Sequence, residues 1–220
     1  MGRTLILGAS GGIGGALAKA CAARGEDVTA LSRSVDGFDI TDGDSVTHHL
    51  GGRAPFDRIV VATGALEIAG AEPEKTVRSI RAQAMADQFA LNAIGPALVL
   101  SHAHSLLPRD RRAVFTVLTA RVGSIGDNRL GGWIAYRAAK AAANQILRTA
   151  AIELARSHKQ TICVALHPGT VATQFTEKYL GRHPAVPPED AAANLLGVMD
   201  ALTPDQTGHF FDWAGKPVPW

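Results

Sequence analysis

The chain has 220 residues, 46% hydrophobic and 19% charged, a composition that fits one globular domain with a full core and excludes disordered, fibrous and coiled-coil proteins. The 22 Lys and Arg residues nearly balance the 20 Asp and Glu residues, so no basic stripe indicates a nucleic-acid partner. Cys21 and Cys163 have no metal-type spacing, so we expect neither a disulfide framework nor a metal site. The first apolar run is too short for a signal peptide or a membrane span, and we expect a soluble cytoplasmic protein without membrane partners.

Apolar runs of strand length alternate with stretches of helical period along the chain. Because the runs are continuous, they indicate strands buried on both faces, as in a parallel sheet. The alternation predicts right-handed crossovers and one doubly wound α/β domain of the Rossmann type over residues 1–220. The expected strands are Thr4–Leu7, Val28–Leu31, Ile59–Ala62, Val114–Leu118, Ile162–Leu166 and His209–Trp213, and the expected helices are Ile13–Arg24, Asp44–Leu50, Glu74–Leu107 with a break near Asn92–Pro96, Ile134–Ser157 and Pro188–Leu202.

The first strand runs into a glycine-rich turn, Gly8-Ala9-Ser10-Gly11-Gly12-Ile13-Gly14, which a helical pattern follows at once. A helix N-terminus there offers free backbone N–H groups to a phosphate, and the glycines let a pyrophosphate approach the backbone. We interpret the turn as a dinucleotide site that includes Ser10 and Ile13. The same residues satisfy Gly-x-Ser-x-Gly, so a serine hydrolase with Ser10 as nucleophile, and with Asp190 and His209 as partners, is a minor alternative.

The second strand ends in Leu31-Ser32-Arg33-Ser34, about twenty residues after the glycine turn, where a dinucleotide fold places the residue that selects the ribose. An acidic residue there would bind the 2′-hydroxyl of NAD, whereas Arg33 can pair bidentately with a 2′-phosphate. No acidic side chain follows until Asp36. The sequence therefore favours NADP(H) over NAD(H).

Tyr136 and Lys140 lie four residues apart in a strongly helical segment, so they share one face about one turn apart. A free tyrosine has a pKa of about 10, and a neighbouring ammonium lowers that pKa by stabilising the phenolate. Such a tyrosine exchanges a proton with a substrate hydroxyl or carbonyl. Since the chain has only two tyrosines, this pair is the candidate acid/base site.

Together with Tyr136 and Lys140, the Gly-x-x-x-Gly-x-Gly spacing of Gly8, Gly12 and Gly14 resembles the short-chain dehydrogenase/reductase family, and the resemblance covers essentially all 220 residues. Further similar segments are Asp39 and Ile40, like the pair that borders the adenine; Asn92 within Leu91–Gly95; and Pro168–Thr173, like the segment that holds the nicotinamide carboxamide, through Pro168, Gly169, Val171 and Thr173. The fragments Gly123–Asn128, Ala135–Ala138 and Phe210–Trp220 resemble in particular the C-factor-like branch.

The resemblance implies hydride transfer between a nicotinamide and a small-molecule carbonyl or secondary alcohol. Tyr136 would be the catalytic acid/base, Lys140 would lower its pKa and hold the nicotinamide ribose, and Asn92 would order a water in the proton relay. Gly64 would admit the adenosine ribose. The family resemblance also implies a homodimer or homotetramer, packed through the alanine-rich faces around residues 83–107 and 138–155.

The sequence departs from the family where a catalytic serine is expected, because Ala120 stands at that position. Thr119 is one residue away and would point to the opposite side of a regular strand, whereas Ser124 lies in the loop, twelve residues before Tyr136. We rank Ser124 above Thr119 as the hydroxyl that polarises the carbonyl. Without either, turnover would fall on the order of a hundredfold or more. The missing serine keeps open a second function, a non-catalytic NAD(P)H-binding sensor or signalling protein on the same fold.

Residues near the end of the chain complete the expected site. The segment Gln174–His183 is expected to form a short lid over an open, permissive substrate pocket. His167 is expected either near the cofactor or in a structural role. Trp133, Trp213 and Trp220 either close the substrate pocket or fill gaps in the packing.

Overall fold

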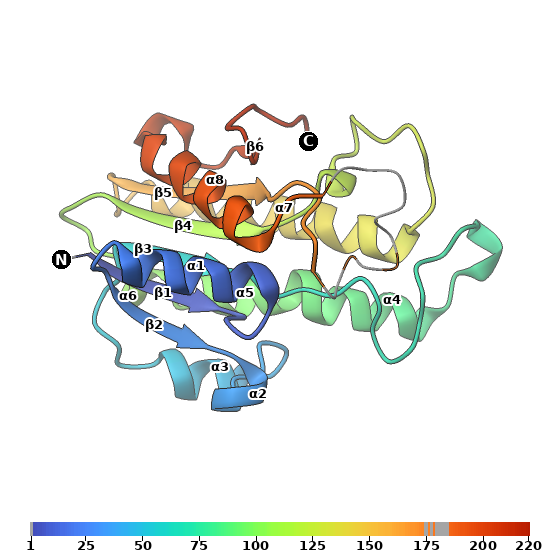
Figure 1. The fold of residues 1–220 in the computed structure, drawn as a ribbon, viewed down its shortest axis with the longest axis horizontal. Coiled ribbons are helices and arrows are strands. Elements are labelled where there is room, and N and C mark those ends of the chain that lie inside the picture. The colour runs from blue at the N-terminus through green and yellow to red at the C-terminus, as the bar shows by residue number, and fades with distance from the viewer. Residues whose placement is uncertain (1, 174–175, 177, 179–184) are drawn as a thin grey trace.

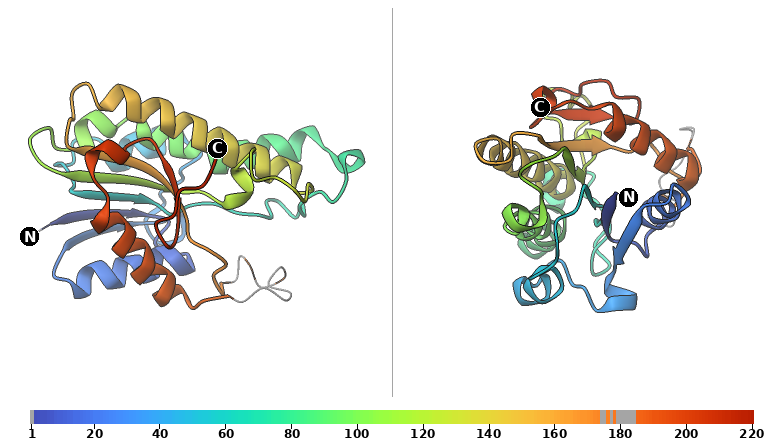
Figure 2. Two further views of the ribbon diagram at one scale, coloured as in Figure 1. Left: turned by 90° about the horizontal axis from the view of Figure 1, so that it is seen from above. Right: turned by 90° about the vertical axis from the view of Figure 1, so that its left-hand side faces the viewer.

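Six parallel strands form one sheet in the order β2-β1-β3-β4-β5-β6 in the computed structural model, which describes residues 2–173, 176, 178 and 185–220. Helices cover both faces of the sheet (Figures 1 and 2). This architecture confirms the predicted doubly wound α/β fold. The strands are β1 (Arg3–Leu7), β2 (Asp27–Leu31), β3 (Arg58–Val61), β4 (Ala113–Leu118), β5 (Thr161–His167) and β6 (Phe210–Asp212), and each overlaps a predicted strand.

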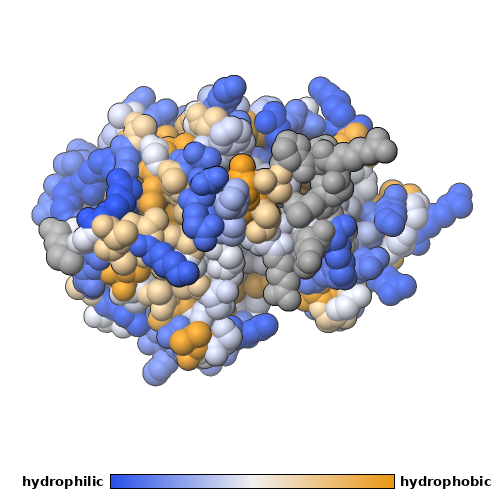
Figure 3. Space-filling model, viewed as in Figure 1, coloured by the Kyte–Doolittle hydropathy of each residue, from blue (hydrophilic) through white to orange (hydrophobic). Residues whose placement is uncertain are grey.

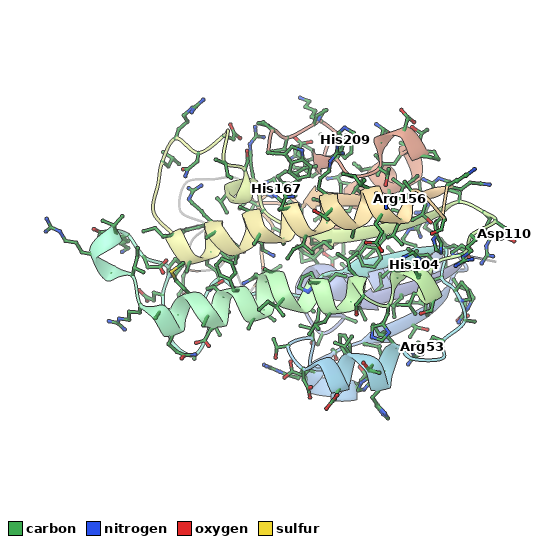
Figure 4. The ribbon with its side chains drawn as sticks, turned by 180° about the vertical axis from the view of Figure 1, so that it is seen from behind. Arg53, His104, Asp110, Arg156, His167 and His209 are labelled. Atoms are coloured by element: carbon green, nitrogen blue, oxygen red, sulfur yellow. The ribbon has the colours of Figure 1, made fainter. Side chains whose placement is uncertain are left out.

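The helices form two layers. On one face α1 (Gly12–Ala23) packs against α8 (Pro188–Ala201), and on the other α5 (Gly95–Leu100) packs between α3 (Gly43–Leu50) and α7 (Ile134–Leu154). The second layer is continued by α4 (Ala82–Phe89), which also packs against α7 (Figure 4). The shorter elements are α2 (Arg33–Asp36), α6 (Ala103–Leu106), the 3-10 turns η1 (Val77–Ser79), η3 (Arg121–Gly123) and η5 (Pro204–Gln206), and the π-helical turn η2 (Ala90–Ile94).

The sheet divides the core into two apolar clusters, one under each layer of helices. Successive strand residues point to opposite faces, so Val60 lies in the cluster under α1 and α8 and Val61 in the other, both fully buried. All six residues of β4 are buried. Burial on both faces explains why the strands read as continuous apolar runs in the sequence.

The predicted break near Asn92–Pro96 is a π-helical turn, so the helix runs without interruption from Ala82 to Leu100. Pro96 has no N–H group, and its ring would clash with the carbonyl four residues earlier in a regular α-helix. A π turn shifts the hydrogen-bond pattern by one residue and accommodates the proline. Asn92 and Ala93, in the middle of this turn, are buried.

The prediction that this helix begins at Glu74 is wrong, because it begins at Ala82. The segment before it holds the short turn η1, whose cap Thr76 accepts a hydrogen bond from the Arg78 amide at 3.4 Å. Glu74 is buried and accepts hydrogen bonds from the start of α7, from the Trp133 amide at 2.5 Å and the Ala135 amide at 3.2 Å. These tertiary contacts override the local helical pattern.

The parallel sheet brings the carboxyl ends of its strands to one edge. Leu7 is paired with Leu31 and Val61, and the same row continues through Val117 to Ala165. The loops that follow these strands contain the glycine turn, Gly64, Ala120 and the Pro168–Thr173 segment. Ligands bind outside this edge in open α/β sheets, so the fold gathers the predicted site residues there.

No helix in the described ranges is long and apolar enough to cross a bilayer. On the side of α1 and α8, hydrophobic residues lie scattered among hydrophilic ones (Figure 3).

Candidate active site

The glycine turn is built by the backbone. The amides of Gly8 and Ala9 donate to the Leu31 carbonyl at 2.8 and 3.1 Å, which fastens the turn to the end of β2. Gly8 has φ +91°, and a Cβ on Gly14 would lie 2.2 Å from the Gly8 carbonyl oxygen. Helix α1 has no side-chain cap and no acidic residue in its first turn. Its N-terminal N–H groups and the positive end of its dipole are therefore uncompensated, which fits a phosphate.

Two other loops close on this turn. A Cβ on Gly12 would lie 2.6 Å from Cγ2 of Thr173, and one on Gly8 would lie 2.9 Å from the Thr63 amide nitrogen. Gly169 has φ +81°, and its Cα faces the Trp213 ring, with 3.0 Å from a Cβ position to Cδ1. Val171 forms an isolated parallel bridge with Val186. The glycine turn, the loop after β3 and the Pro168–Thr173 segment thus line one continuous edge.

Arg33 is the exposed first residue of α2, at the carboxyl end of β2. The nearby acidic side chain, Asp36, is turned back and accepts a hydrogen bond from the Ser32 amide at 2.8 Å. Asp39 accepts from the hydroxyl and amide of Thr41 at 2.7 and 2.9 Å, and these bonds, with the charge of Arg33, hold the pKa of Asp39 below its usual range. The two carboxylates are thus engaged in local hydrogen bonds, and the Arg33 side chain is exposed at the carboxyl end of β2.

Ile40, the partner of Asp39 in the predicted adenine border, is buried beside the π turn. A Cβ on Gly95 would lie 3.0 Å from its Cγ2, so a larger residue there would push Ile40 aside. The loop after β2 is thereby seated against the helix that carries Asn92.

Tyr136 and Lys140 lie side by side on α7, and both are buried. The Lys140 Nζ is 5.7 Å from the centre of the Tyr136 ring and donates to the Leu118 carbonyl at 3.1 Å. Burial raises the pKa of Tyr136 and lowers the pKa of Lys140 to about 8. In this environment burial outweighs the expected lowering of the tyrosine pKa by the ammonium. At neutral pH the pair is therefore a phenol beside a mostly protonated amine, which is a proton-donating arrangement.

Asn92 meets this pair across Gly64. The Asn92 side chain is fully buried, and its Nδ2 donates to the Ala65 carbonyl at 3.0 Å. A Cβ on Gly64 would lie 2.8 Å from Asn92 Oδ1 and 3.2 Å from Lys140 Nζ. The structure thus brings Tyr136, Lys140, Asn92 and Gly64 together at the carboxyl edge of the sheet.

The loop after β4 packs directly against Lys140, because a Cβ on Gly123 would lie 2.8 Å from the Lys140 Cβ. Ser124 is buried, and its Oγ accepts a hydrogen bond from the Asp127 amide at 3.1 Å. Thr119 is buried too, and its hydroxyl has no hydrogen-bond partner within the described residues. Both hydroxyls therefore retain a proton to donate.

His167 ends β5 at the same edge and is paired with Asp212 of β6. Burial and the charge of Arg121 lower the pKa of His167 to about 4, so its ring is neutral at pH 7. The Gln174–His183 lid, apart from Thr176 and Lys178, lies outside the described residues.

The three tryptophans have different surroundings. Trp133 precedes α7 in a left-handed conformation, φ +51°, and its ring centre is 6.4 Å from that of Tyr136. Trp213 packs on Gly169, and Trp220 stacks on Phe210 with 5.9 Å between ring centres. Trp133 therefore borders the candidate site, whereas Trp220 is 40% exposed and covers Phe210 from the surface.

The serine hydrolase alternative is not supported by the fold. Ser10 follows β1, and His209 immediately precedes β6, with three strands between them. Strands lie about 4.8 Å apart, so the two residues are separated by about 19 Å across the sheet. The ring of His209 instead contacts the Gln206 carbonyl, with 3.0 Å between Nδ1 and the oxygen.

Sequence reasoning missed two buried polar residues next to the site, Glu74 and Gln88. Both are placed beside Tyr136 and Ala135 around a small hollow. Gln88 lies four residues before Asn92, so a polar residue one turn away on the same buried helix face was the available signal. Glu74 carried no comparable signal, because its partners are 59 to 61 residues away.

Comparison with known proteins agrees with this geometry. The profile of a family described as enoyl-(acyl carrier protein) reductase matches residues 37–206. The chain is 32% identical over 230 aligned positions to 1-hydroxy-2-glutathionyl-2-methyl-3-butene dehydrogenase of Rhodococcus sp. (strain AD45), with 100% of both chains covered. It is 37% identical over 139 residues to C-signal of Myxococcus xanthus, covering 62% of this chain and 78% of that protein. The chain belongs to the short-chain dehydrogenase/reductase family.

A solved structure shows the same fold. The NADPH-bound carbonyl reductase from chicken fatty liver superposes with a TM-score of 0.79 at 20% identity, over 99% of this chain and 98% of that one. The protein is thus an oxidoreductase of the short-chain type in family and in fold.

The glycine turn yields a stability prediction. Gly14→Ala should lower the free energy of unfolding by about 1–3 kcal/mol, because the new methyl group would overlap the Gly8 carbonyl and force the turn to shift. Urea denaturation measures the change. The matched control is Gly197→Ala in α8, where no atom lies within 4 Å and the change should stabilise by about 0.5–1 kcal/mol. Equal stability of Gly14→Ala and wild type would contradict the tight turn.

Proposed function

We propose that the protein is an NADP(H)-dependent reductase of small-molecule carbonyl compounds, which oxidises the corresponding secondary alcohols in reverse. The observation that carries the proposal is the buried pair of Tyr136 and Lys140, with Asn92 facing Lys140 across Gly64. Carbonyl reduction needs a proton donor at the oxygen, and this arrangement provides one. The carbonyl reductase activity named for the chicken structure supports the same substrate class.

The cofactor's residues are those of the carboxyl edge. Gly8, Ser10, Gly12, Ile13 and Gly14 would hold the pyrophosphate at the N-terminus of α1. Arg33 would bind the 2′-phosphate, and the remaining contacts would come from Asp39, Ile40, Gly64, Lys140, Pro168, Gly169, Val171 and Thr173. Bound NADPH would supply the hydride to the carbonyl carbon.

Tyr136 acts as the acid in reduction. Its burial keeps the phenol protonated at neutral pH, and the phenol O–H donates its proton to the carbonyl oxygen as negative charge develops there. The phenolate that remains is stabilised by the Lys140 ammonium. A proton returns to Tyr136 from the Lys140 side of the site, where Asn92 provides an acceptor for an ordered water. Alcohol oxidation runs the same transfers in reverse.

A hydroxyl near Ala120 replaces the usual serine in this proposal. Ser124 is the first choice and Thr119 the second, and either would donate to the substrate oxygen. Ala120 is also the observation that favours the second candidate, a sensor or signalling protein that binds NAD(P)H without turnover. Turnover with a carbonyl substrate decides between the two.

The compartment and the oligomeric state are further parts of the proposal. Cys21 and Cys163 are free and buried, which fits the reducing cytoplasm. Helices α5 and α7 border a groove with both apolar and polar lining, the His104–Glu153 pair included, which would fit a second copy packed across a two-fold axis. Its lining includes Ala97, Leu100, Ile146, Thr149, Ala150 and Leu154.

The first test is turnover. Purified protein should oxidise NADPH with at least one member of a panel of aldehydes and ketones, and Tyr136→Phe should lower kcat by about a hundredfold or more, because the proton donor is lost. Absorbance at the NADPH band measures the rate. Tyr136→Phe should still bind NADPH, which fluorescence titration checks.

Variants of the two hydroxyls refine this test. Ser124→Ala should lower kcat more than Thr119→Val if Ser124 polarises the carbonyl. NADPH binding without turnover on any substrate would reject the reductase and favour the sensor.

The second test concerns the choice of cofactor. Arg33→Ala should weaken NADPH binding about tenfold to a hundredfold and leave NADH binding unchanged, because only NADPH has the 2′-phosphate that the guanidinium pairs with. Parallel fluorescence titrations with both cofactors measure this. Arg156→Ala, an exposed arginine beyond the end of α7, is the control. An equal loss for both cofactors would contradict the selector role.

The third test is the oligomeric state. Size-exclusion chromatography with light scattering should give a dimer or tetramer, and Thr149→Arg should shift it toward monomer by placing a charge in the groove between α5 and α7. Val35→Arg, on the 80% exposed Val35 of α2, should leave the assembly unchanged. A monomeric wild type would contradict the proposal.

A further inference from the structure

Two side-chain amides, Gln88 and Asn92, are joined by a hydrogen bond, and the free oxygen of Asn92 borders the same space as Lys140 Nζ. Both residues are buried, with 6% and 0% of their surface exposed, on the helix face that packs against α7. Gln88 Nε2 donates to the Leu66 carbonyl at 2.8 Å, and Asn92 Nδ2 donates to Gln88 Oε1 at 2.7 Å and to the Ala65 carbonyl at 3.0 Å. The two amides thus bind consecutive carbonyls of the loop after β3.

The backbone fixes the orientation of both amides. A carbonyl oxygen only accepts, so the Leu66 carbonyl requires the NH₂ group of Gln88 and turns Gln88 Oε1 toward Asn92. That oxygen and the Ala65 carbonyl are both acceptors, so together they require the NH₂ group of Asn92. A flip of either amide would set an oxygen against an oxygen. Asn92 can therefore present only Oδ1 on its other side.

Asn92 Oδ1 is buried without a hydrogen-bond partner within the described residues. A Cβ built on Gly64 would lie 2.8 Å from Asn92 Oδ1 and 3.2 Å from Lys140 Nζ, so both atoms border the same small space beside Gly64. An ammonium has three N–H donors, and that of Lys140 donates one hydrogen bond to the Leu118 carbonyl. No ion pair to Lys140 is found in residues 2–173, 176, 178 and 185–220. A fixed acceptor that shares this space with the ammonium stabilises its charge electrostatically, and one bridging water would strengthen the effect.

We propose that Gln88 is a positioning residue, which locks the Asn92 amide so that its oxygen faces Lys140 and stabilises the ammonium that the reaction uses. The proposal rests on the proposed function for its role in turnover, but the lock itself is a property of the free protein. With Gln88 removed, Asn92 is free to turn its NH₂ group toward the ammonium, and the charged state becomes less stable.

The titration of Lys140 tests the lock without any substrate. Gln88→Met keeps the length of the side chain and removes both hydrogen bonds, and it should lower the pKa of Lys140 by about 0.5 to 1. The pKa is followed through the Lys140 Nζ and Cε resonances by NMR, assigned with Lys140→Arg. The groups around Nζ are Tyr136 on the same helix, the Leu118 carbonyl of β4 and, across Gly64, Asn92. Gln83→Met, on the exposed side of α4, is the matched control and should change nothing.

A double-mutant cycle separates positioning from a general structural effect. In the Asn92→Ala background, Gln88→Met should leave the pKa of Lys140 unchanged, because the residue through which Gln88 acts is gone. An equal fall in both backgrounds, or an unchanged pKa in the single variant, would overturn the proposal. If Gln88→Met does not fold, Gln88→Leu also removes both hydrogen bonds and should lower the pKa of Lys140 by the same amount, and an unchanged pKa would overturn the proposal.

Kinetics connect the lock to catalysis. With an active carbonyl substrate, Gln88→Met should lower kcat about tenfold with little change in KM. In alcohol oxidation, the rise of the rate with pH should move to higher pH. The reason is that a smaller fraction of protonated Lys140 stabilises the Tyr136 phenolate less and so raises the pKa of Tyr136. If the wild type shows no turnover but Gln88→Met lowers the pKa of Lys140, the reductase proposal is rejected and the positioning role of Gln88 is kept. If the wild type turns over carbonyl substrates but Gln88→Met leaves the pKa of Lys140 unchanged, the reductase proposal is kept and the positioning role is rejected.

Discussion

The constraint on which the site depends is the parallel direction of all six strands. In such a sheet every carboxyl end lies at one edge. The loops that follow β1, β2, β3, β4 and β5 therefore meet there, although they lie far apart in the sequence. The helices supply what the edge lacks. Helix α1 offers its N-terminus, α7 carries Tyr136 and Lys140 as neighbours, and the π turn holds Asn92 against Gly64. The candidate site thus depends on the strand direction and on three helical elements packed around one edge of the sheet.

Much of this was predictable from local pattern. Continuous apolar runs located the six strands, and the glycine spacing located the turn before α1, because each signal lies within a few neighbouring residues. The four-residue spacing of Tyr136 and Lys140 placed both on one helix face. A disturbance of the helix near Pro96 was predictable from the missing N–H group, but its form, a π turn within an unbroken helix, was not.

Contacts between distant segments were not predictable from the sequence. Glu74 lies in a stretch with a helical pattern. Its carboxylate and carbonyl nevertheless accept hydrogen bonds from the Ala135 and Trp133 amides at the start of α7, and the segment around Glu74 is not helical. Gln88 donates to the carbonyl of Leu66 in a loop more than twenty residues earlier, and no side-chain identity marks that backbone partner. The lowered pKa of Lys140 likewise comes from burial, which depends on the complete fold.

The π turn lets one helix carry a polar site residue without disturbing the packing of its two halves. Each residue in an α-helix adds about 100° of rotation, and the wider π turn takes up one extra residue with nearly the same total rotation. Gln88 before the turn and Pro96 after it therefore both stay buried. A single-residue deletion within residues 90–94 would restore a uniform α-helix with α4 and α5 on their present faces. The change would fall on the residues inside the turn, where Asn92 lies.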